Sequence, residues 1–179
     1  MAGVTLAWKP VSRFWRIYHP TKQDLPLPKT LWAMEAGEGA AVTKRNLTDA
    51  DLPPLRKAFE TQIYGSYCGV ASSVIALKTL GSTAQQTTFF SPKTEAIRSE
   101  RQVFYGGMTL DELGKLLTAH GAKTTVVHAS DSSVDAFRTE ARANVEGSGD
   151  VLLINYYRKT LEQKGGGHIS PVAAYDTES

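Results

Sequence analysis

The sequence predicts an α+β domain with a helical N-terminal part and a β-rich C-terminal part. Apolar residues recur at helical spacing in Gln62–Leu80 and in Met108–Gly121, and a glycine suited to ending a helix closes each pattern. Short apolar runs follow near the end of the chain, at Val151–Tyr156 and Val172–Tyr175, where we expect strands. Helices first and strands afterwards give the predicted fold class.

Length and composition describe one ordinary globular domain. The 179 residues are enough for a single core, and a formal net charge of +2 gives no reason to expect nucleic acid as a partner. The single cysteine excludes an internal disulfide and a metal cage of several cysteines. The sequence has no transmembrane run, and Met1–Trp15 lacks the apolar core of a signal peptide. We therefore expect a cytoplasmic protein without membrane contact, and export of the protein is the alternative.

Residues 1–47 are expected to form an irregular arm in front of a domain spanning 48–179, because four prolines interrupt any long helix there. Aromatic residues should anchor this arm to the body of the protein. They are Trp8, Phe14, Trp15, Tyr18 and Trp32. Basic residues among these rings suggest a nucleic-acid surface as an alternative, which the near-neutral total charge disfavours.

The elements after the arm follow from local signals. Thr48 can cap a short helix whose apolar side ends at Phe59, and residues 82–107 are polar and loop-like. Thr109 and Glu112 fit a capping box at the start of the second long helix.

Further on, Lys123–His128 is rich in β-branched residues and is expected to be a strand. Ser132 or Ser133 should begin an amphipathic helix reaching Val145, and the two predicted strands follow it.

Cys68 is expected in the first turn of the first long helix, where the positive end of the helix dipole favours a thiolate. Small neighbours leave room for a substrate. Gln62 lies six positions earlier and could aim its amide beside the Cys68 backbone N–H, the pairing that builds an oxyanion hole. A buried, inert cysteine is the alternative.

A histidine lies far away in the sequence. The segment GGGHISPVAAY places His168 at the head of an apolar run, after three glycines. A lone cysteine with a distant histidine at a strand start is typical of cysteine-nucleophile enzymes, whereas the alternative is a loop histidine without a role. Arg158 could clamp a carboxylate in bidentate fashion, or be a solvated loop residue.

Four blocks resemble the catalytic domain of phytochelatin synthases, most closely the short bacterial and cyanobacterial type without the cysteine-rich C-terminal domain. They read QIYGSYCGVAS, GGMTLDELGKLL, VVHASD and INYYRKTLEQKGGGHISPVAAY, within 59–175. The resemblance implies a papain-like fold and a γ-glutamylcysteinyltransferase that cleaves glycine from glutathione. Cys68 would be the nucleophile, His168 the proton carrier and Gln62 an oxyanion donor.

The resemblance also implies how substrates are bound. The implied substrate-binding positions are Tyr67, Asn155, Arg158 and Gly167. Glutathione and γ-glutamylcysteine peptides would be the partners, and a homodimer is possible. No metal site is expected in the protein, because cadmium or zinc would arrive as a thiolate complex of glutathione in a heavy-metal response.

One departure from the family affects the triad. The family's catalytic aspartate lies on the strand after the histidine strand, and the sequence stops at Ser179. We therefore expect a C-terminally truncated sequence, a triad aspartate beyond Ser179 and an unpaired edge on Val172–Tyr175. Asp176 aligns with a turn position and receives no role. Two other functions stay open: a papain-like leader peptidase, and a non-catalytic domain that binds thiol peptides.

Overall fold

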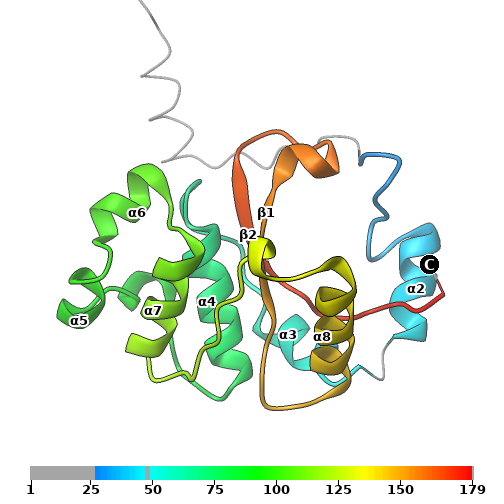
Figure 1. Cartoon of the computed structure of the whole chain (residues 1–179), viewed down its shortest axis with the longest axis horizontal. Helices are drawn as coiled ribbons and strands as arrows, with labels where there is room; N and C mark the ends of the chain where they lie inside the picture. The colour runs from blue at the N-terminus through cyan, green and yellow to red at the C-terminus, as the bar shows by residue number, and fades with distance from the viewer. Residues whose placement is uncertain (1–26, 47–48, 179) are drawn as a thin grey trace, which may run out of the picture.

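The computed structural model describes residues 27–46 and 49–178, and the account below is restricted to them. These residues form an α+β fold in which helices precede a two-stranded sheet (Figure 1). The elements are α2 (Gly37–Arg45), α3 (Leu52–Ala58), α4 (Cys68–Thr79), α5 (Pro92–Glu95), α6 (Glu100–Gly106), α7 (Leu110–Ala119), α8 (Val134–Glu146), β1 (Leu153–Tyr157) and β2 (Gly167–Pro171). Three 3-10 turns join them, at 86–88, 129–131 and 158–161.

Helix α4, the first of the two long helices that the sequence predicts, lies at the centre of the fold. All nine residues of 69–77 are buried, and a helix that is apolar on every side belongs in a core. Its apolar residues pack with Tyr67, Phe89, Val103 and Leu116. Gly81 follows with a φ of +88°, a conformation that ends a helix at little cost only in glycine.

The prediction of a loop over residues 82–107 is wrong, because this segment contains α5 and α6. Ser91 and Ser99 begin these helices with capping boxes that satisfy the first free N–H groups. The predicted capping box of Thr109 and Glu112 is confirmed at α7.

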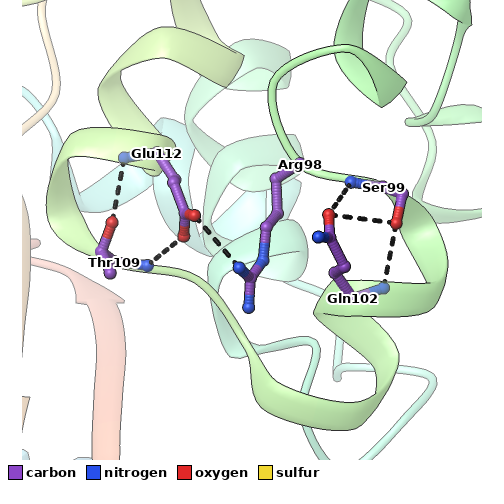
Figure 2. A network of polar contacts seen from close by, with 5 residues as sticks. All are labelled: Arg98, Ser99, Gln102, Thr109 and Glu112. Atoms are coloured by element: carbon purple, nitrogen blue, oxygen red, sulfur yellow. Dashed lines mark hydrogen bonds and ion pairs between the residues drawn. The ribbon is translucent and has the colours of Figure 1, made fainter.

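Arg98 directly precedes the capping box of α6 in the sequence and bonds to the capping box of α7. Its guanidinium lies between them and donates to Glu112 Oε1 over 3.2 Å (Figure 2). This contact fixes the turn between α6 and α7, and Met108 in that turn packs against Gly69 of α4.

Strands β1 and β2 pair antiparallel, with Tyr156 opposite His168. The predicted strand at Val151–Tyr156 is therefore confirmed as β1. The prediction for Val172–Tyr175 is wrong: this segment is irregular, and the N–H groups of its first and last residues bond to Leu152 O and Asp49 Oδ2. The expected unpaired edge on this segment is wrong for the same reason.

The strand predicted at Lys123–His128 is also wrong. The segment has no regular secondary structure and pairs with no strand among the described residues. It packs on α7, where Val126 contacts Gly114. Strand propensity reflects packing on a sheet surface, and within residues 27–46 and 49–178 this segment belongs to no sheet. The helix predicted from Ser133 to Val145 is confirmed as α8, capped by Ser133.

The expected N-terminal arm is only partly described. Residues 37–45 are helical as α2, so irregular structure throughout 1–47 is wrong. Trp32 is 53% exposed and Phe59 is 68% exposed, so neither contributes the buried contact expected of it. Thr48 and the other aromatic residues of the arm lie outside the described residues.

A buried hydrogen bond joins α4 to β2. Ser72 Oγ donates to the carbonyl oxygen of Ile169 over 2.9 Å. At the two ends of this antiparallel pair, Arg158 N–H bonds to Gly166 O and Val172 N–H bonds to Leu152 O. Hydrogen-bonded and non-hydrogen-bonded pairs alternate between these ends, so Ile169 belongs to a non-hydrogen-bonded pair. Its carbonyl therefore points away from β1. Ser72 thus satisfies an acceptor on the outer edge of the sheet.

Among the described helices, none is long and apolar enough to cross a bilayer.

Two neighbouring serines allow a test of this bond. Ser72→Ala should lower the free energy of unfolding by about 1–3 kcal/mol, because it leaves the Ile169 carbonyl buried without a partner. Ser73 Oγ is buried and has no hydrogen-bond partner among the described residues, so Ser73→Ala is a matched control expected to be neutral or stabilising. Urea denaturation of both variants makes the comparison. Equal losses would mean that the Ser72 hydroxyl does not hold α4 to β2.

Candidate active site

Cys68 is the first residue of α4 and is half-buried, as expected for a nucleophile at a helix N-terminus. The turn before it is bonded to α6, because Ser66 Oγ donates to Phe104 O over 2.6 Å. A side chain at Gly69 would collide with Met108, since an added Cβ would lie 2.6 Å from the Met108 sulfur. The start of α4 is therefore enclosed by the turn between α6 and α7.

His168 lies on β2, the strand that contacts α4. Its imidazole packs edge-on against Tyr156 at 5.6 Å between ring centres, and its Nδ1 lies 2.6 Å from Nη2 of Arg158. Burial, and then the nearby Arg158 charge, lower the pKa of His168 to about 4. The imidazole is therefore neutral at physiological pH in this arrangement.

Arg158 reaches His168 across the glycine segment before β2. A Cβ at Gly165 would lie 3.0 Å from Arg158 Cδ, and Gly165 has a φ of +117° that favours glycine. The absence of a side chain there leaves room for the arginine stem. Gly165 thus allows the close packing of Arg158 beside the start of β2.

Gln62 lies in the loop before α4, and its amide is already oriented. Nε2 donates to the carbonyl oxygen of Tyr64 over 2.7 Å. The same loop is held by Gln86, whose Oε1 accepts from the Ile63 N–H over 3.1 Å. A primary amide has two N–H groups, so Gln62 Nε2 can donate its second N–H to another acceptor. The oxyanion role of Gln62 stays a prediction.

Tyr67 has a buried side chain, with its hydroxyl donating to Glu100 over 2.9 Å. Burial and the neighbouring Glu100 raise the pKa of this hydroxyl. The Tyr67 ring packs in the core and its hydroxyl is bonded to Glu100, so any substrate contact by Tyr67 would come from its backbone.

Asn155 and Gly167 lie on the sheet face opposite His168. Residues directly opposite each other in an antiparallel pair share a face, and neighbours alternate. Tyr156 and His168 share one face, whereas Asn155 and Gly167 belong to the other. The structure thus brings Arg158 to His168 but places Asn155 and Gly167 apart from that imidazole, and their substrate-binding role stays a prediction.

Asp176 lies against α2, consistent with giving it no catalytic role. Its carboxylate accepts from Arg45 over 2.8 Å and from Asn46 over 3.3 Å. Among the described residues, the ring of His168 is bonded to a cation, where a triad would place a carboxylate. In the same part of the chain, no cluster of three His, Cys, Asp or Glu side chains is arranged to hold a metal ion.

Three residues at this site were missed in the sequence. Ser72 had a signal, since its hydroxyl lies four positions after Cys68, about one helical turn from the candidate nucleophile. Tyr156 also had a signal, because it lies on the predicted strand that precedes His168. Met108 had no signal, because nothing in the local sequence indicates its contact with Gly69.

Comparisons with known proteins place the chain in a family. A family model described as phytochelatin synthase matches residues 22–179, so the similarity also covers much of the expected arm. The chain is 26% identical over 161 residues to the glutathione gamma-glutamylcysteinyltransferase of Schizosaccharomyces pombe, covering 83% of this chain and 38% of that protein. It is 25% identical over 166 residues to glutathione gamma-glutamylcysteinyltransferase 1 of Arabidopsis thaliana, covering 88% of this chain and 34% of that protein.

A third relative is glutathione gamma-glutamylcysteinyltransferase 1 of Lotus japonicus, 28% identical over 123 residues, which are 65% of this chain and 25% of that protein. The chain thus spans between 25% and 38% of the length of these curated relatives. Because the family model covers residues 22–179, including Cys68 and His168, the chain belongs to the phytochelatin synthase family.

Proposed function

We propose that this chain is the catalytic part of a glutathione γ-glutamylcysteinyltransferase with a papain-like arrangement. One observation carries the proposal: a buried hydrogen bond ties the helix that begins at Cys68 to the strand that bears His168. A cysteine at a helix N-terminus and a histidine on an adjoining strand form the nucleophile and the proton carrier of a cysteine enzyme. The names of the curated relatives supply the substrate class.

The first half-reaction is acyl transfer to sulfur. The Cys68 thiolate attacks the carbonyl carbon of the Cys–Gly amide in glutathione, and the amide oxygen takes the negative charge. The Cys68 backbone N–H and the second amide N–H of Gln62 stabilise that oxyanion. His168 accepts the thiol proton and passes it to the glycine nitrogen as the C–N bond breaks, which leaves a γ-glutamylcysteinyl thioester on Cys68.

The second half-reaction transfers the acyl group. Water attacks the thioester carbonyl to release γ-glutamylcysteine, or the amine of a second glutathione attacks it to release a phytochelatin. In either case the attacking group loses a proton and the Cys68 sulfur leaves as thiolate. Cadmium or zinc enters as a thiolate complex of glutathione, so the ion is part of the substrate. A role in the heavy-metal response, a cytoplasmic location and a homodimer complete the proposal.

A non-catalytic domain that binds thiol peptides is the second candidate, favoured by the Arg158 cation on His168. Incubation with glutathione and with an unrelated peptide distinguishes the candidates. Release of glycine from glutathione alone supports the transferase, and cleavage of the peptide alone supports a leader peptidase. Binding of glutathione without turnover supports the binding domain.

Replacing the nucleophile tests the mechanism. Cys68→Ser should reduce glycine release from glutathione below detection, because a hydroxyl forms a far weaker nucleophile than a thiolate. The fold should be retained, since oxygen and sulfur are similar in size. Glycine is measured by amine derivatisation and the fold by circular dichroism. Undiminished glycine release in a folded variant would exclude Cys68 as the nucleophile.

Gln62→Ala removes one oxyanion donor and should lower kcat by about 100- to 1000-fold with little change in KM. Gln85→Ala is the matched control, because Gln85 is an exposed glutamine in a nearby loop. Steady-state kinetics of both variants are compared with the unaltered protein. A rise in KM alone would mean that Gln62 only lines the substrate site.

A further inference from the structure

We propose that Gln86 is a positioning residue for Gln62: its side chain fixes the loop that holds the Gln62 amide beside the start of α4. The inference rests on the proposed function, because the role it assigns is to aim an oxyanion donor. It goes further by naming a buried side chain, outside the reacting groups, on which that donor depends.

The loop that carries Gln62 has few contacts of its own. Residues 60–63 join α3 to the turn before α4 and have no regular secondary structure. Within the described part of the chain, no hydrogen bond between main-chain atoms involves these residues. Thr61 and Ile63 are exposed, so the core does not hold them. Side-chain contacts therefore set the position of Gln62.

Gln86 bonds to the loop on both sides of Gln62. Its Nε2 donates to Thr61 O and to Glu60 Oε1, each over 2.9 Å, and its Oε1 accepts from the Ile63 N–H over 3.1 Å. Both N–H groups and the oxygen of this amide are engaged, so only one orientation of the amide satisfies the loop. Gln86 is 6% exposed, which leaves water little access to replace these bonds. We call this set of bonds the Gln86 clamp.

The clamp is anchored to the far end of the helix that begins at Cys68. Glu60 Oε2 accepts from Lys78 Nζ over 2.7 Å, and Lys78 lies in the last turn of α4. Burial opposes the charged form of Glu60, but the bonds from Lys78 and Gln86 outweigh it, and the pKa of this carboxyl is lowered. Glu60 therefore stays a carboxylate at neutral pH, and the loop begins at a fixed point on α4.

The other end of the loop reaches the start of α4. Gln62 Nε2 donates to Tyr64 O over 2.7 Å, and the same carbonyl accepts from the N–H of Tyr67 over 3.0 Å. Tyr67 directly precedes Cys68, so the Gln62 amide is bonded within the turn that presents the nucleophile. The loop is thus held at both ends of α4, and Gln86 fixes the residues between.

Loss of the clamp would release Gln62 without removing it. An oxyanion donor stabilises the transition state only at hydrogen-bonding distance, so a displacement of about 1 Å can lower the rate by about 100-fold. Binding of the substrate should change little, because the donor acts on charge that develops only in the transition state.

Gln86→Met tests the clamp, because methionine has a similar length and no amide. At a temperature well below thermal unfolding of the variant, kcat for glycine release should fall by about 10- to 100-fold with little change in KM. Gln85→Met is the matched control, since it alters the exposed neighbouring glutamine and should leave kcat unchanged. A folded Gln86→Met protein with full kcat would refute the positioning role and leave the proposed function standing.

Gln86→Glu is the second variant should the methionine protein fail to fold. It keeps the size of the side chain, but it replaces the donor to Thr61 and sets a second carboxylate against Glu60. It should lower kcat in the same way, and full kcat in this variant would equally refute the positioning role.

A double-mutant cycle separates positioning from a general effect on the fold. In the Gln62→Ala background, Gln86→Met should lower kcat by no more than about twofold, because the donor that the clamp aims is already absent. Equal losses in the two backgrounds would overturn the proposal, since Gln86 would then act through some other group.

The side-chain amide of Gln62 gives a readout that needs no turnover. Nitrogen–proton NMR of the unaltered protein should show its two N–H signals in one ordered environment, and Gln86→Met should average them. No difference between the two proteins would refute the positioning role. An amide that is ordered only when Gln86 is present, in a protein that releases no glycine, would support the clamp and refute the proposed function.

Discussion

The hydrogen bond from Ser72 to the Ile169 carbonyl is the constraint on which the site depends. Ser72 lies about one helical turn after Cys68, and Ile169 follows His168 directly, so this bond relates two residues that are distant in sequence. It is buried, and a buried acceptor without a partner is costly, so the bond specifies one relative placement of helix and strand. The apolar core around α4 supplies most of the stabilisation, while the serine supplies the alignment.

Local rules predicted those parts of the fold that local interactions determine. Helix α4 follows from an apolar run with a glycine stop, α7 from its capping box and α8 from Ser133. The failures lie where tertiary contacts decide. Lys123–His128 has strand-forming residues, but it packs on α7, and no strand in the described part of the chain pairs with it. Helices α5 and α6 are too short for a periodic signal, although each has a serine cap that could have been recognised.

The sequence nominated residues for the candidate site but did not predict the contacts between them. Cys68 and His168 were recognised from residue type, spacing and family resemblance. The bond between Arg158 and His168 was not, because it depends on a turn that folds back over Gly165. Ser72 escaped notice because its partner is a backbone carbonyl, and sequence gives no sign of which carbonyl lies at a sheet edge. Contacts between residues of different elements can be recognised only in the tertiary structure.

The contact between Gly69 and Met108 has a consequence for how this sequence can vary. A side chain at position 69 would occupy the space that the thioether now fills, next to the nucleophile. An unbranched methionine can withdraw, whereas a β-branched residue at 108 could not. Tolerance at 69 is therefore conditional on 108, and the two positions should covary among homologues. Randomising both positions together should therefore admit residue pairs at 69 and 108 that randomising either position alone would not admit.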